Sequence, residues 1–297
     1  MKKIFIIGGT TFDHIITLES FPEPVPQTIH RAMFNEATGS TGAGKALCLT
    51  KLGVPNVLYS VLGNDEYGNR IIRHLESENV KLIFDFDPKG TERHVNIMNS
   101  EGERISIFIT QSSEKPQISF EKVEQNVSNA DIIVLNIISY CKEIIPFLPV
   151  KQKPVWTDLH DHTDGNEYHE PFIEVSDYIF LSSDNLTDYK QTMTRFMERG
   201  KELVVCTHGK NGATALTKNG DWIEEPALKG YKLTDSNGAG DCFFSGFLYA
   251  YCLGKSVEDC MRFGAICGAE SITSNQLVPN HLSSKYVNDI FLKRFKE

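Results

Sequence analysis

The sequence predicts a three-layer α/β/α sandwich with a mainly parallel sheet and a small β-lid. Along most of its 297 residues, short apolar runs alternate with amphipathic stretches. Continuous apolar strands that are covered on both faces by helices are what a parallel sheet requires. Two regions break the alternation, which indicates a separate β-element. The chain shows no repeat or linker, so we expect one domain over residues 1–297.

The elements of the main layers can be placed from these runs. The expected strands cover residues 4–7, 57–61, 132–135, 155–156, 178–181 and 203–206. The expected helices cover residues 43–52, 67–77, 186–199 and 239–253. Short β-rich runs that alternate with amphipathic helices are typical of doubly wound α/β folds.

The two exceptional regions predict the lid. Residues 21–34 are rich in proline and do not read as a helix. Residues 91–98 and 103–109 read as two strands joined by a short turn, with the half-polar alternation of a sheet that has one wet face. We therefore expect lid elements at approximately 14–37 and 91–110, which would close over a functional site. The alternative is that these elements are surface additions with no role at the functional site.

Charge and composition narrow the classes of function. The net charge of -9 argues against a nucleic-acid partner, because duplex binding needs a basic face. No apolar run approaches the ~20 residues of a membrane-spanning helix, and the run at residues 4–7 is too short for a signal peptide. Seven cysteines without a C-x-x-C pair read as reduced thiols. We expect a cytoplasmic protein with a small-molecule substrate, no membrane contact and no nucleic acid.

One segment carries the chemistry: a turn of small residues that opens directly into an apolar helix. The amides of Gly238, Ala239 and Gly240 would lie at the helix N-terminus, where the dipole is positive and an anion can bind. Asp241 would direct its carboxylate to the same place. Phosphoryl transfer needs both parts, because the phosphate oxygens need fixed donors and the attacking hydroxyl needs a base. The alternative is that Asp241 only complements the helix dipole.

This segment resembles the C-terminal signature of the ribokinase-like (PfkB) carbohydrate kinases, Asp-Thr-x-Gly-Ala-Gly-Asp, with Ser236 in place of Thr. The resemblance runs through nearly the whole chain. It implies a ribokinase-like fold and γ-phosphoryl transfer from ATP to a hydroxyl of a sugar or nucleoside-like molecule. It also implies that Asp241 is the catalytic base and that the amides of residues 238–240 form an anion hole.

The N-terminal segments are expected to bind the acceptor. Asp13 follows the first strand, where open α/β sheets bind ligands, and is similar to the family's substrate aspartate. A turn-capping role is the alternative. Gly39 and Gly42 belong to a stretch that resembles the family's glycine-rich sugar-binding signature. Ser40 replaces the usual second glycine and Gly44 the usual substrate-binding Asn, so standard ribose or fructose recognition is not expected.

The same stretch also fits the Gly-x-x-x-x-Gly-Lys of a P-loop. Ala46 stands where a hydroxyl should reach Mg²⁺, and residues 32–38 make a poor buried strand. A P-loop NTPase that depends on Lys45 therefore stays a second hypothesis. The kinase interpretation expects Asp241 to be essential and Lys45 to be largely dispensable.

The nucleotide-binding residues are implied by the family resemblance. Thr207, Gly209 and Gly212 resemble the family's Thr-x-Gly turn, although a strand followed by a hairpin explains the glycines as well. Asn275 falls where the family often lines the adenine pocket, and Asp158 falls at a family Asp position near the ATP phosphates.

The cofactor expectations are ATP and Mg²⁺, and the resemblance also admits a monovalent cation. Where the family has Asn-x-x-Glu for Mg²⁺, this chain has Ser182 and Asn185, so no metal ligand is assigned directly. That loss motivates a third hypothesis, a degenerate family member that binds sugar or nucleotide as a sensor. His160 and His162 could bind a structural metal, but a solvated loop is favoured. Lid sheets of the family often form dimer interfaces, so a homodimer through the lid is considered.

Overall fold

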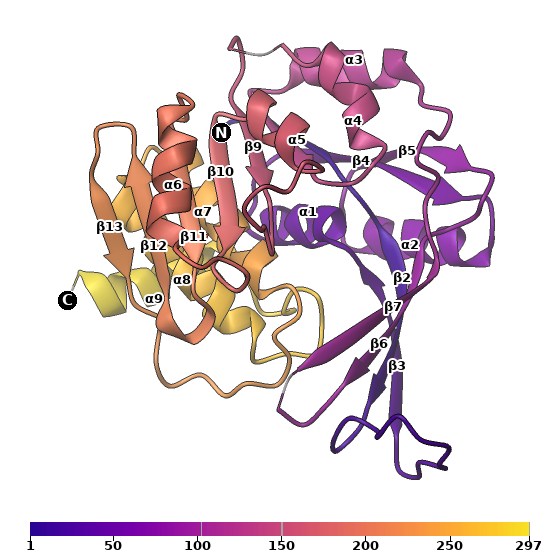
Figure 1. The fold of residues 1–297 in the computed structure, drawn as a ribbon. Helices are drawn as coiled ribbons and strands as arrows, with labels where there is room; N and C mark the ends of the chain where they lie inside the picture. The colour runs from indigo at the N-terminus through magenta and orange to yellow at the C-terminus, as the bar shows by residue number, and fades with distance from the viewer. Residues whose placement is uncertain (102, 150, 297) are drawn as a thin grey trace.

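The computed structural model describes residues 1–101, 103–149 and 151–296, and these residues form two separate β-sheets (Figure 1). The strands of the large sheet are β1 (Ile4–Ile7), β4 (Asn56–Gly63), β5 (Leu82–Asp87), β8 (Ile132–Asn136), β9 (Val155–Asp158), β10 (Tyr178–Ser182), β11 (Leu203–Thr207), β12 (Ala213–Thr217) and β13 (Trp222–Glu225). Their order is β13-β12-β11-β10-β9-β8-β1-β4-β5. Pairing is parallel from β5 to β11 and antiparallel at β12 and β13. The mainly parallel sheet is therefore confirmed.

The small sheet projects from the body and has the order β3-β2-β6-β7 (Figure 1). Its strands are β2 (Thr11–Thr17), β3 (Met33–Gly39), β6 (Arg93–Met98) and β7 (Arg104–Thr110). The antiparallel pair β6–β7 confirms the predicted hairpin, while the predicted turn includes Gly102, which lies outside the described residues. Strand β2 was not predicted, because the residues after β1 read as a turn. We refer to this sheet as the lid.

Helices cover both faces of the large sheet, which makes three layers. Alternate side chains of β1 point to opposite faces, so Ile4 and Ile6 join one buried core while Phe5 and Ile7 join the other. The first core is covered by α1 (Thr41–Lys51), α2 (Glu66–Ser77), α7 (Ala239–Cys252), α8 (Val257–Ser271) and α9 (Ser284–Phe295). The second core is covered by α3 (Phe120–Asn129), α4 (Cys141–Ile144), α5 (Glu170–Val175) and α6 (Tyr189–Glu198).

Close packing of α1 and α7 brings the two glycine-rich segments together. The hydroxyl of Ser245 in α7 donates to the backbone carbonyl of Lys45 in α1 at 3.4 Å. Helix α1 also lies directly against the chain after β1, because a Cβ on Gly42 would fall 2.5 Å from the carbonyl oxygen of Gly9. These contacts place the start of α1 beside the start of α7.

Three smaller expectations can be compared with the fold. Asp65, which precedes a helical stretch and was expected to be its N-cap, caps α2 by accepting a hydrogen bond from the amide of Gly68 at 2.8 Å. All seven cysteines are free, and six of them are buried. Among the described residues, no helix combines the length and the apolar character needed to cross a bilayer.

Candidate active site

Asp241 lies in the first turn of α7 and is buried, with only 8% of its surface exposed. The N-cap of the helix is Gly238, whose φ of 78° is in the left-handed region that favours glycine. A side chain there would also collide with the carbonyl oxygen of Leu277, at 2.7 Å. The turn therefore needs this glycine, and it delivers Asp241 to a fixed place beside α1.

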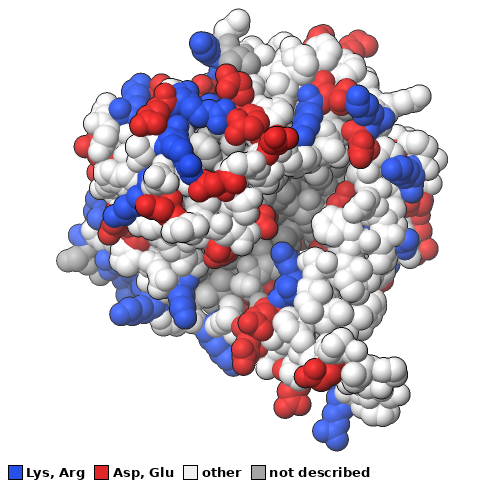
Figure 2. Space-filling view, in the orientation of Figure 1, with Lys and Arg blue, Asp and Glu red and all other residues white. Residues whose placement is uncertain are grey.

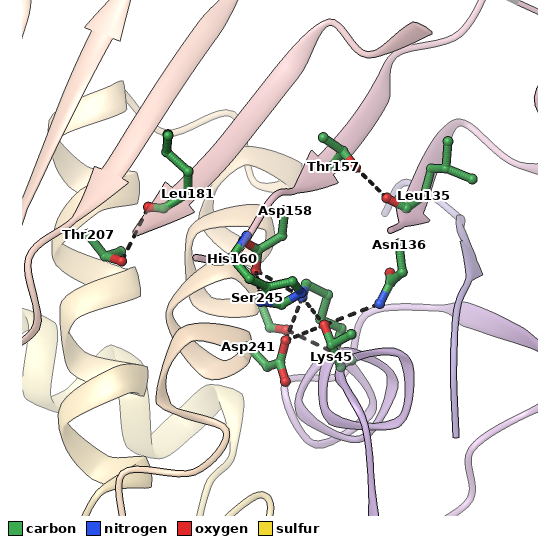
Figure 3. A network of polar contacts seen from close by, with 11 residues as sticks. Lys45, Leu135, Asn136, Thr157, Asp158, His160, Leu181, Thr207, Asp241 and Ser245 are labelled. Carbon is green, nitrogen blue, oxygen red and sulfur yellow. Dashed lines mark hydrogen bonds and ion pairs between the residues drawn. The ribbon is translucent and has the colours of Figure 1, made fainter. Parts of the chain in front are cut away.

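Two side chains of α1 hold one oxygen of the Asp241 carboxylate (Figure 3). Oδ1 accepts from the hydroxyl of Thr41 at 2.6 Å and from the ammonium of Lys45 at 2.5 Å. Lys45 is fully buried, and it also donates to Thr41 at 2.5 Å and to Asp158 at 3.1 Å. We call Thr41, Lys45, Asp158 and Asp241 the charged cluster.

The charges of this cluster stabilise one another. Burial alone would lower the pKa of Lys45, but the carboxylates of Asp241 and Asp158 raise that pKa above its usual value. Burial alone would raise the pKa of Asp158, but His160 and Lys45 hold that pKa at about 2. Lys45 and Asp158 are therefore both charged at neutral pH, and Lys45 acts as the counter-ion for two carboxylates.

The absence of a side chain at Gly44 is part of this geometry. A Cβ at this position would lie 2.8 Å from Oδ2 of Asp241 and 3.2 Å from its Cβ. The carboxylate therefore lies directly against the backbone of α1, in space that an Asn would fill.

Asp13 lies in the lid and is buried, with 4% of its surface exposed. Its carboxylate accepts hydrogen bonds from Thr11 at 2.7 Å and from Asn96 at 3.1 Å. Burial raises the pKa of Asp13, although the Thr11 hydrogen bond and His94 partly oppose this. A Cβ at Gly39 would fall 2.1 Å from Asp13 Oδ2, so the glycine makes room for the carboxylate. The turn-capping alternative is wrong, because Asp13 lies within β2.

The lid touches the segment that leads into α7. Arg104 of β7 donates a hydrogen bond to the side chain of Asn237. Figure 2 shows a deep hollow between the lid and the body of the molecule. The contact connects the lid to the turn that precedes Asp241, which is the placement expected of a lid over an active site.

The three amides predicted as an anion hole are not equally available. The amide of Ala239 donates to the carbonyl oxygen of Ser236 at 3.3 Å, so it is engaged within the turn. A Cβ at Gly240 would meet no atom within 4 Å, so this backbone faces open space. Phosphate binding by all three amides stays a prediction.

The residues predicted to bind ATP lie along the same edge of the sheet or near it. Thr207 ends β11 and donates to the carbonyl oxygen of Leu181 at 3.4 Å (Figure 3). Gly209 begins a short 3-10 turn, and Gly212 has a φ of 99° that favours glycine. Asn275 is exposed in the segment after α8. Because parallel strands β9 and β11 end at one edge, Thr207 and the charged cluster share that edge.

The solvated-loop interpretation of residues 158–164 holds only in part, because Asp161, Thr163 and Asp164 are exposed while His162 is not. His162 and His169 are buried, and their Nδ1 atoms lie 2.8 Å apart. Asn185 donates to the backbone carbonyl of Asp161 at 3.1 Å, which ties this loop to the segment after β10. Within the described ranges, no three His, Cys, Asp or Glu side chains are grouped so that they could hold a metal ion.

Sequence reasoning missed the role of Lys45. Gly42, Gly44 and Lys45 lie inside α1, so no loop wraps a phosphate there and the P-loop hypothesis is wrong. The expectation that Lys45 is dispensable to a kinase is also at odds with its bond to Asp241. Thr41, which donates to Asp241, and Asn136, which donates to Thr41 at 3.2 Å, were missed as well. The only signal was a lysine inside an apolar helical stretch, which is costly unless it is paired.

Comparison with known proteins identifies relatives over most of the chain. A model of the pfkB family carbohydrate kinases matches residues 1–146 and 173–281. The acarbose 7(IV)-phosphotransferase of Actinoplanes sp. is 30% identical over 91% of this chain and 92% of its own length. A nucleoside kinase of Methanocaldococcus jannaschii is 26% identical over 89% of this chain and 88% of its own length.

Solved structures show the same fold. A microbiome-derived acarbose kinase superposes with a TM-score of 0.88 at 24% identity, covering 97% of this chain and 98% of that one. The ribokinase of Thermotoga maritima superposes with a TM-score of 0.81 at 21% identity, covering 99% of this chain and 100% of that one.

Replacing Gly44 with Ala should lower kcat by about 10²-fold, because the methyl group would push the Asp241 carboxylate out of place. Steady-state kinetics and thermal unfolding of the purified variant measure both activity and folding. Gly268→Ala on α8 is the matched control, since a Cβ there approaches no atom closer than 3.4 Å. A Gly44→Ala variant with unchanged kcat would show that the close approach is irrelevant.

Proposed function

The chain belongs to the pfkB family of carbohydrate kinases, and we propose that Asp241 is the base of its reaction. The enzyme is a phosphotransferase that transfers a phosphoryl group from ATP to the hydroxyl of a sugar or a related molecule. One observation carries the proposal: Oδ1 of Asp241 is fixed by Thr41 and Lys45, while the helix N-terminus beside it borders open space at Gly240.

The geometry supports separate roles for the two oxygens of Asp241, for the N-terminus of α7 and for the lid. With Oδ1 engaged, Oδ2 of Asp241 is the oxygen that accepts the proton of the attacking hydroxyl. The N-terminus of α7 stabilises the negative charge on the transferred phosphate through its dipole and amides. A carboxylate suffices as the base, because the proton leaves late in a loose transition state. Closure of the lid excludes water and so limits hydrolysis of ATP.

The residues present suit ATP and Mg²⁺: open backbone suits the nucleotide, and side-chain oxygens suit a hydrated metal ion. The backbones of Gly209 and Gly240 face open space, which leaves room there for a nucleotide and its phosphates. Ser182 and Asp184, at the end of β10, offer oxygens that suit a hydrated Mg²⁺ better than a directly bound one. When bound, Mg²⁺ would neutralise charge on the phosphates. Rates compared in K⁺ and Na⁺ buffers decide whether a monovalent cation is also needed.

The acceptor proposal rests on Asp13. Its buried carboxylate faces the lid residue Asn96, and such a pair can bind the hydroxyls of a sugar. Gly44 stands where the family usually has its substrate-binding Asn, so that contact of standard ribose recognition is missing. Since two of the similar proteins are named for acarbose, a saccharide of that type is the first acceptor to test.

The release of ADP should be measured with acarbose, ribose, fructose and a set of nucleosides, for the wild type and for Asp241→Asn. We expect turnover with at least one saccharide, and a loss of about 10²–10⁴ in kcat for Asp241→Asn, because the base is removed while its shape is kept. A variant that kept most of its rate would contradict the mechanism. Binding without turnover by the wild type would instead favour a sensor.

Acidification should raise the acceptor KM of the wild type. Burial raises the pKa of Asp13, so this carboxylate loses its charge at a higher pH than an exposed aspartate does, and the neutral form binds hydroxyls more weakly. Asp13→Asn should have a KM about 10–100-fold higher that no longer depends on pH. The acceptor KM measured across pH checks this, and equal pH dependence in both proteins would contradict it.

We also propose that two copies associate through the lid. Phe34, Ile105 and Ile107 are exposed, and strand alternation places them on the face opposite to Asp13 and Asn96. The free thiols are consistent with work in the reducing cytoplasm.

Sedimentation should give the mass of a dimer for the wild type and of a monomer for Ile107→Asp, because a charge on this face would have to be desolvated in the interface. Sedimentation of the wild type as a monomer at micromolar concentration would contradict the association. Unchanged kinetics of Ile107→Asp would show that the lid itself is intact.

A further inference from the structure

We propose that Lys45 is a positioning residue of the kinase: it fixes one oxygen of Asp241 so that the other oxygen serves as the base. The inference rests on the proposed role of Asp241 and adds a residue to it. Lys45 does not need to touch either substrate for this role. Its ammonium is fully buried between α1, α7 and the end of β9 (Figure 3).

Hydrogen bonds to all three of its N–H donors fix the position of the Lys45 ammonium. An ammonium has three N–H donors, and the three acceptors of Lys45 are Thr41 at 2.5 Å, Asp241 at 2.5 Å and Asp158 at 3.1 Å. These oxygens come from α1, α7 and β9. Lys45 therefore joins three elements at one point, and a displacement of Asp241 would break one of these bonds.

Thr41 makes the arrangement directional. Its hydroxyl oxygen accepts from Lys45 at 2.5 Å and from the side-chain amide of Asn136 at 3.2 Å, which uses both of its lone pairs. Its single proton must then point at Oδ1 of Asp241, 2.6 Å away. Oδ1 thus receives two donors, one of them charged. Because Oδ1 is engaged in this way, proton transfer from an acceptor is directed to Oδ2, the oxygen that lies against the backbone of Gly44.

Asp158 supplies the second carboxylate charge that balances the buried Lys45 ammonium together with Asp241. Two buried carboxylates without a cation would repel each other, and one of them would take up a proton. The Lys45 ammonium lies between Asp158 and Asp241, and it also lies 4.9 Å from the centre of the Phe244 ring. The charged cluster, with His160 3.6 Å from Asp158, therefore holds the Asp241 carboxylate in one orientation.

The test replaces Lys45 with Met, which keeps the length of the side chain and removes the charge. We expect kcat to fall by about 10²-fold, because the base is displaced, while KM for ATP and for the acceptor stays within about threefold. Lys51→Met is the matched control on the same helix, since Lys51 pairs with Glu78 at 2.7 Å, away from the cluster. The control should keep the kcat of the wild type.

The same substitution made in the Asp241→Asn variant distinguishes positioning of the base by Lys45 from a general contribution of Lys45 to folding. In Asp241→Asn, the further change Lys45→Met should lower kcat by less than about twofold, because there is no base left to position. An equal loss of kcat in both backgrounds, or an unchanged kcat of Lys45→Met in the wild type, would overturn the inference. If Asp241→Asn alone kept its rate, the proposed base would be wrong as well, so the two failures differ.

Thr41→Val provides the same test with less disturbance, should Lys45→Met fail to fold. The substitution keeps the shape of the side chain and removes only the hydroxyl that donates to Asp241. We expect a loss of about tenfold in kcat at unchanged KM, the size of one lost hydrogen bond. An unchanged kcat would overturn the anchoring of Oδ1.

Discussion

A buried lysine between two carboxylates is the interaction on which this active site depends. Lys45 has no contact with solvent, and its charge is acceptable there only because Asp158 and Asp241 neutralise it. Removing one partner of such a buried pair typically costs about 3–5 kcal/mol, because the other charge stays buried without compensation. The same pairing that makes the lysine tolerable also holds the carboxylate of Asp241, the proposed base, in one place.

The fold supplies the close approaches that this pairing needs. Glycines let backbone and carboxylate come together at Gly39 beside Asp13 and at Gly44 beside Asp241. Ser40 has a φ of 75°, a left-handed conformation in which the family's usual glycine would be unstrained. The lid then reaches the turn before α7 through Arg104 and Asn237. The proposed acceptor site, the lid and the proposed base are thus connected through a few short segments.

Much of the fold could be predicted from local sequence, and much less of the site. Strand 4–7 was placed to the residue because its apolar run stops at a pair of glycines. Strand β2 was missed because only three residues separate Thr11–Thr17 from the first strand and because it mixes polar with apolar residues. Asp241 was found from its turn, which is a local signal. Lys45 was not, because its partners lie 113 and 196 residues away and only the folded chain brings them together.

The most direct test of this account is a crystal structure with the acceptor and a non-hydrolysable ATP analogue. It should show the reacting hydroxyl about 2.6–3.2 Å from Oδ2 of Asp241, with Lys45 and Thr41 still bound to Oδ1. A hydroxyl that faced another residue, or a Lys45 that had turned away from Asp241 toward the phosphates, would contradict it.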